Sequence, residues 1–204
     1  MRGLFVTLEG IDRSGKTTQT QLLVDALGND QAISVREPGG TAVGERVREL
    51  LKDPGVEIGA EAEALLFAAA RAELVAQVIA PALEQGLVVV SDRFLDSSLA
   101  YQGGARGLGL QGVARINEWA TGGVVPDLTI LLRIDPETAA SRAGEADRFE
   151  DEGTDLQRAV ADTYAQLAAA DPSRWVVVDA SRSPDDVHGD VLDAVVRARS
   201  RVAV

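Results

Sequence analysis

The segment that most constrains this chain is Gly10–Thr17, which reads Gly-x-x-x-x-Gly-Lys-Thr. It follows an apolar, β-prone run that ends at Glu9, and a helical pattern begins directly after it. A glycine-rich loop between a strand and a helix points backbone N–H groups inward at the positive end of the helix dipole, which suits it to hold phosphate groups. An ordinary glycine-rich turn is the alternative. The position of Lys16 favours phosphate binding, because this chain has only one other lysine, Lys52.

Each residue type in this loop has a physical role. Gly10 and Gly15 let the backbone turn tightly, Lys16 can reach the β- and γ-phosphates of a nucleotide, and the Thr17 hydroxyl can bind Mg²⁺. We therefore predict that a nucleoside triphosphate binds along the loop and the first turn of the helix. The predicted residues are Gly10, Ile11, Asp12, Arg13, Ser14, Gly15, Lys16, Thr17 and Thr18.

The composition restricts the possible partners. The formal net charge is −12, whereas broad nucleic-acid binding needs a basic surface. A polyanionic ligand is compatible with this charge only if some arginines gather at one site. The chain has no cysteine, which excludes disulfides and thiolate chemistry. We read no apolar run as long enough to span a membrane and no room for a signal peptide, so we expect a cytoplasmic protein.

Five short apolar runs have the composition of buried parallel strands, and helical patterns separate them. The runs are Leu4–Glu9, Ala32–Arg36, Leu87–Asp92, Leu128–Ile134 and Trp175–Asp179. This alternation indicates an α/β fold, so we predict a five-stranded, mostly parallel sheet with helices on both faces. With 204 residues the chain is long enough for a packed core, and we expect residues 1–204 to form one domain.

Polar side chains stand at the carboxyl end of each predicted strand. They occur at Glu9, Arg36-Glu37, Asp92-Arg93, Asp135 and Asp179. Ligands of open α/β sheets bind at this edge, so we expect most of these groups to converge on a ligand. Asp135 precedes Pro136-Glu137 and is better explained as a helix N-cap. The Asp92-Arg93 pair is either a structural ion pair or a site for metal and phosphate.

The longest helical pattern runs from Glu61 to Glu84 and is apolar on more than one stripe, as in a helix that faces a core on one side and another surface on the other. Pro81 should loosen its last turn. Arg71 lies in this apolar stretch and needs a partner, for which a ligand anion is a better candidate than a surface salt bridge. Phe67 lies one turn earlier on the same side, either as a core residue or as a platform for a base.

Residues 142–153 are charged, contain a glycine near each end and lie between two helical patterns. They form either a solvated loop or a lid that closes over a nucleotide, with Arg142 and Arg148 as its cations.

Taken together, these motifs resemble those of thymidylate kinases, which phosphorylate thymidine monophosphate from ATP. The resemblance covers nearly the whole chain, and the ordered set is far more specific than the phosphate-binding loop alone. It rests on the loop, on Arg36-Glu37-Pro38-Gly39-Gly40-Thr41, Leu66-Phe67-Ala68-Ala69-Ala70-Arg71, Asp92-Arg93-Phe94, Ala100-Tyr101-Gln102-Gly103-Gly104 and Asp147-Arg148-Phe149-Glu150.

This resemblance implies a P-loop kinase fold, production of thymidine diphosphate for deoxythymidine triphosphate synthesis, Mg²⁺ as cofactor and ATP as co-substrate. It also implies a homodimer joined through the helix at 61–84. For substrate binding it implies Phe67 on the thymine ring, Arg71 and Gln102 at the base, Ser98 facing the base or the sugar, Tyr101 under the sugar, and Arg36, Glu37, Pro38, Arg93 and Asp12 around the monophosphate. Asp12 and Asp92 would join Thr17 in positioning Mg²⁺, and Arg142 would join the ATP site.

One departure concerns the catalytic cations. Members of this family carry a basic residue either in the loop or in the lid, and the bacterial type with Arg-Glu-Pro-Gly-Gly usually lacks the one in the loop. This chain has Arg13 there. The catalytic set that we predict is Arg13, Lys16, Asp92, Arg93 and Arg148, and we expect Arg13 to contribute more than Arg148, which lies among acids.

Two other functions compete with this prediction. The first is a nucleotide-dependent switch, which the missing guanine-reading Asn/Thr-Lys-x-Asp motif disfavours. The second is a kinase for a nucleoside or for another nucleoside monophosphate.

Overall fold

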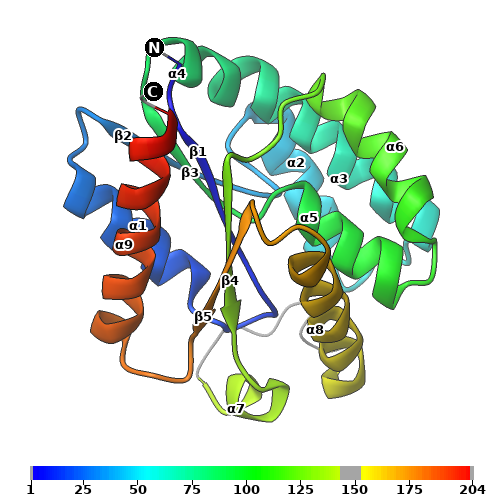
Figure 1. Cartoon of the computed structure of the whole chain (residues 1–204). Coiled ribbons are helices and arrows are strands. Elements are labelled where there is room, and N and C mark those ends of the chain that lie inside the picture. Colours follow the sequence, from blue (N-terminus) through cyan, green and yellow to red (C-terminus); the bar gives the residue numbers. More distant parts are fainter. Residues whose placement is uncertain (1, 143–152, 203–204) are drawn as a thin grey trace.

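The structure is a computed structural model that describes residues 2–142 and 153–202. Its centre is a five-stranded sheet in the order β2-β3-β1-β4-β5, and every pairing is parallel (Figure 1). The strands are β1 (Phe5–Glu9), β2 (Ala32–Arg36), β3 (Val88–Asp92), β4 (Leu128–Arg133) and β5 (Trp175–Asp179). The sequence prediction of an α/β fold with five strands is confirmed, and no strand end differs from its predicted position by more than one residue.

Helices cover both faces of the sheet (Figure 1). They are α1 (Lys16–Leu27), α2 (Ala42–Lys52), α3 (Ala60–Leu74), α4 (Ala80–Glu84), α5 (Leu95–Ser98), α6 (Leu110–Thr121), α7 (Pro136–Ala140), α8 (Gly153–Ala170) and α9 (Pro184–Val202), with π-helices η1 (Val75–Ile79) and η2 (Leu99–Ala105). Side chains of β1 alternate between the faces because a strand has a period of two. Val6 and Leu8 pack in a core with α1, α8 and α9, while Phe5 packs in a second core with α3, η1 and α4.

The helical pattern predicted for 61–84 is continuous but not uniform. Five of its residues, Val75–Ile79, form the π-helix η1 just before Pro81. A proline has no N–H to donate to the preceding turn, which explains why the hydrogen-bonding pattern changes here.

The same helix corrects one expectation from the sequence. Over Ala60–Glu84 it is long and apolar enough to cross a membrane by length and composition, with a mean hydropathy of 1.5, although we expected no such segment. The helix is built into the fold, because Ala64, Ala68 and Leu74 are buried. Leu65, however, is 57% exposed. Ala62 and Ala69, one turn to either side of Leu65, are also exposed, so the helix has an exposed apolar face, as the sequence predicted.

The glycine-rich stretch after the third strand begins inside a helix, because η2 extends through Gly103 and Gly104 to Ala105. A Cβ atom at Gly104 would lie 2.1 Å from the Thr163 hydroxyl oxygen, so only glycine lets η2 approach α8 this closely. This contact fixes the position of Tyr101 and Gln102 on η2.

Candidate active site

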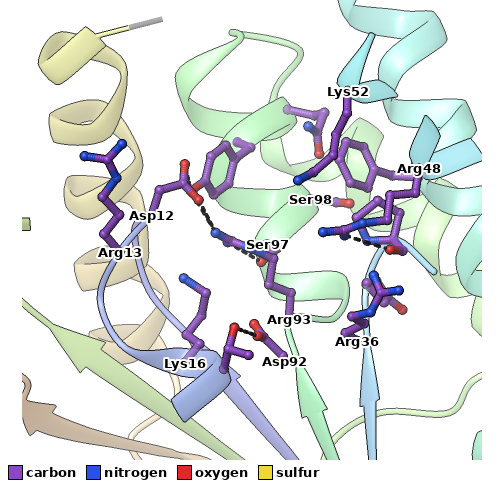
Figure 2. Close-up of a pocket in the computed structure, with 16 residues that line it drawn as sticks. Asp12, Arg13, Lys16, Arg36, Arg48, Lys52, Asp92, Arg93, Ser97 and Ser98 are labelled. Carbon is purple, nitrogen blue, oxygen red and sulfur yellow. Dashed lines mark hydrogen bonds and ion pairs between the residues drawn. The ribbon is translucent and has the colours of Figure 1, made fainter. Parts of the chain in front are cut away.

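The carboxyl ends of β1, β2 and β3 open into a cleft of about 440 Å³ (Figure 2). All but one of the residues predicted to bind the substrate line it, and Arg71 is the exception. The lining residues are Asp12, Arg13, Lys16, Thr17, Arg36, Glu37, Pro38, Arg48, Lys52, Phe67, Asp92, Arg93, Ser97, Ser98, Tyr101 and Gln102. Asp135 is not among them. Its side chain accepts the Thr138 N–H at 3.0 Å, which confirms that it caps α7.

A second cleft of about 490 Å³ lies along the phosphate-binding loop and the start of α1. It is lined by Ser14, Gly15, Thr18 and Arg142, all predicted to bind ATP. Arg13, Lys16 and Thr17 line both clefts. The two clefts therefore share three residues, all in the loop or the first turn of α1.

The loop turns through left-handed backbone at three positions, with φ of 145° at Gly10, 59° at Arg13 and 100° at Gly15. Lys16 is buried beneath this turn, and its Nζ donates to the carbonyl oxygens of Gly10 and Ile11 at 3.0 and 2.6 Å. Burial lowers the pKa of Lys16 from 10.5 to about 8, and the nearby charge of Arg93 acts in the same direction. A phosphate anion beside this amine would favour its charged form.

Arg93 is the centre of a second cluster, just beyond β3. It is one of the two non-glycine residues with positive φ in the described ranges, at 72°. Its guanidinium forms an ion pair with Asp12, donates to the Gly10 carbonyl at 3.2 Å and lies 5.1 Å above the ring centre of Tyr101. Tyr101 in turn donates its hydroxyl to Asp12 at 3.1 Å. A strained backbone held by this many contacts is typical of a functional site.

Asp12 also contacts α8 through Gln157. The Gln157 amide accepts the Asp12 N–H at 3.1 Å and donates to its carboxylate at 2.7 Å. Burial opposes ionisation of Asp12, but the charges of Arg93 and Lys16 and the Gln157 hydrogen bond outweigh it and lower the pKa of Asp12. The carboxylate is therefore charged at neutral pH. Gln157 was not predicted from the sequence, because nothing about an isolated glutamine on a helix indicates a partner.

Asp92 lies opposite Asp12 and accepts the Thr17 hydroxyl at 2.6 Å. This hydrogen bond connects the end of β3 to the first turn of α1, directly after the phosphate-binding loop. Glu9, Asp12, Asp92 and Arg93 come from two neighbouring strands, β1 and β3, which the parallel pairing brings together at one edge of the sheet.

Below Arg93 lies Glu9, which has no solvent exposure. Its carboxyl accepts the Phe94 N–H at 2.8 Å, the Ser97 hydroxyl at 2.6 Å and the Tyr164 hydroxyl at 2.7 Å. Burial and the neighbouring Asp96 carboxylate raise the pKa of Glu9 from 4.5 to about 7. These contacts anchor the chain on the far side of the strained residue Arg93.

Arg71 is buried and does not reach the cleft surface. Its guanidinium forms an ion pair with Glu37 and donates to Ser98 Oγ at 3.1 Å, to the Phe94 carbonyl at 3.0 Å and to Asn117. Its side chain is 0% exposed. A protein carboxylate supplies the partner for which we expected a ligand anion. In this structure Arg71 supports Glu37 and Ser98, which do line the cleft.

Arg13 is oriented toward the chain that follows α7. Its Nη1 donates to the carbonyls of Ala140 and Arg142, each at 3.1 Å, and Arg142 donates back to the Arg13 carbonyl at 3.2 Å. Figure 2 shows its guanidinium pointing away from Lys16 and Arg93. Arg142 also donates to the Ala180 carbonyl at 2.6 Å. Residues 143–152, with Arg148 and most of the predicted lid, lie outside the described residues.

Basic residues gather at the first cleft, as an acidic chain that binds a polyanion requires. Arg36, Arg48 and Lys52 approach it from one side, and Lys16 and Arg93 from the other (Figure 2). Our prediction missed Arg48 and Lys52. Their spacing of four residues on α2 puts them on one helix face, a signal that could have found them.

The five-stranded parallel sheet and the phosphate-binding loop between β1 and α1 define a P-loop nucleotide-binding protein. Comparisons with known proteins identify its family. The family model described as "Thymidylate kinase" matches residues 8–191. The chain belongs to the thymidylate kinase family and is therefore a phosphotransferase of the nucleoside monophosphate kinase class.

Its curated relatives match nearly full length. A thymidylate kinase of Pelotomaculum thermopropionicum is 50% identical over 201 residues, which cover 95% of this chain and 93% of the relative. Thymidylate kinases of Halothermothrix orenii and Deinococcus radiodurans are each 46% identical. The alignments cover 96% and 95% of this chain, and 97% of each relative.

Proposed function

We propose that this chain transfers the γ-phosphoryl group of ATP to thymidine monophosphate, in the presence of Mg²⁺, and releases thymidine diphosphate and ADP. The observation that carries this proposal is the junction of two clefts at Arg13, Lys16 and Thr17. A donor in one cleft and an acceptor in the other would meet beside the only lysine of the loop.

The donor triphosphate would lie in the cleft along Ser14–Thr18, with its phosphates at the N-terminus of α1 and Arg142 beside it. The acceptor would lie in the other cleft. Its phosphate would face Arg36 and Arg93, its sugar would lie against Tyr101, and its base would be read at Phe67, Ser98 and Gln102, which complete the lining.

A magnesium ion fits the groups at this junction. Mg²⁺ prefers oxygen ligands and is usually bound through one or two carboxylates, substrate phosphates and water. Thr17 and Asp92 offer a hydroxyl and a carboxylate already in contact, and Asp12 offers a second carboxylate across the cleft. In residues 2–142 and 153–202 no cluster of three or more acidic or histidine side chains could hold a metal alone, in keeping with an ion bound mainly by phosphate. When bound, the ion would neutralise charge on the phosphates.

The transfer itself needs positioning and charge neutralisation. An oxygen of the acceptor phosphate attacks the γ-phosphorus, the bond from phosphorus to the bridging oxygen breaks, and the electron pair leaves with ADP. Lys16 and Arg93 would neutralise the transferring group from opposite sides. We propose Arg13 as the main additional cation, which requires it to exchange its carbonyl partners for phosphate oxygens, and Arg148 as the weaker one. No side chain has to act as nucleophile.

The test is an assay of ADP release with each nucleoside monophosphate and each nucleoside as acceptor. We expect strong acceleration with thymidine monophosphate and loss of that acceleration in Lys16→Met, which keeps an unbranched side chain one atom shorter and removes its charge. Hydrolysis of ATP that no acceptor accelerates would refute a kinase and favour a nucleotide-dependent switch. Acceleration by a nucleoside instead of a monophosphate would assign another kinase.

We also propose that the chain works as a homodimer in the cytoplasm, as one domain with a lid over residues 142–153. The exposed apolar face of α3 around Leu65 supports an interface with a second copy. The commonest symmetry would pair this face with itself across a two-fold axis.

A further inference from the structure

Glu63 on α3 is a buried glutamate for which the proposed phosphoryl transfer has no use. It is 1% exposed. Arg106 donates to both of its oxygens, from Nε to Oε1 and from Nη2 to Oε2, each at 3.2 Å. Gln102 also donates its side-chain Nε2 to Oε1 at 2.9 Å. The Arg106 guanidinium therefore faces the carboxylate with two parallel N–H···O bonds, and Gln102 adds a third donor.

An ionised carboxylate can only accept hydrogen bonds, whereas the amide of a glutamine has one accepting and one donating end. Gln102 must therefore point its nitrogen at Glu63, because the flipped amide would put two acceptors against each other. Gln102 lines the first cleft, and its Oε1 has no hydrogen-bond partner in the part of the chain that the structure describes. The oxygen is thus the amide atom that remains to accept a hydrogen bond from a ligand.

Backbone hydrogen bonds hold Gln102 close to Arg106. The Gln102 carbonyl accepts the Leu108 N–H at 3.2 Å, and the Arg106 N–H donates to the Tyr101 carbonyl at 2.8 Å. Gln102 and Arg106 are therefore fixed to each other by the turn that closes η2. Glu63 joins this turn to α3, which also carries Phe67.

We propose that Glu63 is a specificity-determining positioning residue, which orients the Gln102 amide so that the cleft accepts a pyrimidine with an N3–H donor and rejects one without it. The inference rests on the proposed function and deepens its choice of base. Thymine and uracil carry a proton on N3, whereas cytosine presents a lone pair there. The N3–H of thymine or uracil can donate a hydrogen bond to the Gln102 oxygen. The lone pair on N3 of cytosine would instead place two acceptors against each other. A polar site of this kind discriminates strongly because a mismatched group is left unpaired.

The experiment compares kcat/KM for thymidine monophosphate and deoxycytidine monophosphate in the wild type and in Glu63→Gln. A neutral amide at position 63 can accept or donate, so it allows both orientations of Gln102. We expect the ratio of the two kcat/KM values to fall about tenfold in favour of the cytosine nucleotide, equal to about 1.4 kcal/mol. Glu61→Gln is the matched control, because Glu61 is exposed near the start of the same helix, and it should leave the ratio unchanged.

A second variant separates orientation from folding. Gln102→Met removes the amide and leaves the Glu63–Arg106 ion pair intact, so it should lower the same ratio. In the Gln102→Met background, Glu63→Gln should then have no further effect on the ratio, because its influence passes through the amide.

The inference would be overturned if Glu63→Gln left the ratio of kcat/KM values unchanged, or if it lowered that ratio equally in the wild type and in the Gln102→Met background. Neither result would contradict the proposed kinase activity. The same holds if the wild type phosphorylates both pyrimidine nucleotides equally. If the wild type phosphorylates no monophosphate, the proposed function itself fails.

Discussion

Glu9 is a buried carboxyl group whose replacement by glutamine changes the pH dependence of stability in a predictable direction. Its three hydrogen-bond donors are the Phe94 N–H and the hydroxyls of Ser97 and Tyr164. The glutamine oxygen can still accept the Phe94 N–H, and its NH₂ can donate to the two hydroxyl oxygens. Glu9→Gln therefore mimics the protonated glutamate with no change of volume.

The magnitude follows from the pKa of Glu9, which is raised from 4.5 to about 7. Between these values the folded state binds the proton more tightly than the unfolded state, so this group stabilises the fold at low pH and the stabilisation is lost as the pH rises through 7. At about 1.36 kcal/mol per pKa unit, the raised pKa makes the free energy of unfolding about 3 kcal/mol larger well below both pKa values than well above them. Between pH 5.5 and 8 the wild type should lose about 2 kcal/mol from this group alone.

Urea unfolding of the wild type and of Glu9→Gln across pH 5.5 to 8 measures this loss of stability. Contributions from other groups cancel to first order, so the free energy of unfolding of Glu9→Gln minus that of the wild type should rise by about 2 kcal/mol with pH. Glu84→Gln, at an exposed position on α4, should show no such rise. A difference that does not rise with pH would contradict this prediction, and a flat difference would show that Glu9 is ionised across the whole range.

Three further predictions concern the site and the assembly. Arg13→Ala should lower kcat strongly with little change in KM for the monophosphate, because a guanidinium at the transferring group acts mainly in the transition state. Single-turnover rates should rank Arg13→Ala below Arg148→Ala, and the reverse order would assign the catalytic cation to the lid. Tyr101→Ala should narrow the preference for deoxyribose over ribose, measured as the ratio of kcat/KM values for the two substrates. Tyr101→Phe keeps the ring and should keep the preference. An unchanged ratio in the alanine variant would exclude Tyr101 from this role. Light scattering at micromolar concentration should report a dimer that an aspartate in place of Leu65 weakens, and a monomeric wild type would refute the proposed interface.

Much of the site could be predicted from the sequence, because it consists of short segments with a local signature. The loop from Gly10 to Thr17 has a conformation that its glycines permit and a position that the strand before it fixes. The polar ends of β1, β2 and β3 converge because parallel strands end at the same edge of a sheet. These features depend on residues close in the chain, and the family resemblance carried the rest of the cleft lining except Arg48, Lys52 and Ser97.

The remaining features depend on which segments meet, and a single sequence does not contain that information. Arg71 is paired with Glu37, 34 positions away, and not with a ligand, because the packing of α3 against the end of β2 brings these two groups together. Gln157 reaches Asp12 across 145 positions. Arg13 is held by carbonyls near the end of α7, so its direction is set by a contact and not by its place in the loop.

The sequence by itself therefore determined the class of fold, the order of its strands and helices along the chain, and the presence of a phosphate-binding loop. These follow from hydrophobic period and local backbone preference, which are written in neighbouring residues. Only the tertiary structure decided the partner of each buried charge and the orientation of Gln102. A buried charge or amide takes whichever complementary group the packing brings within about 3 Å, and hydrogen-bonding distance in space is independent of distance along the chain.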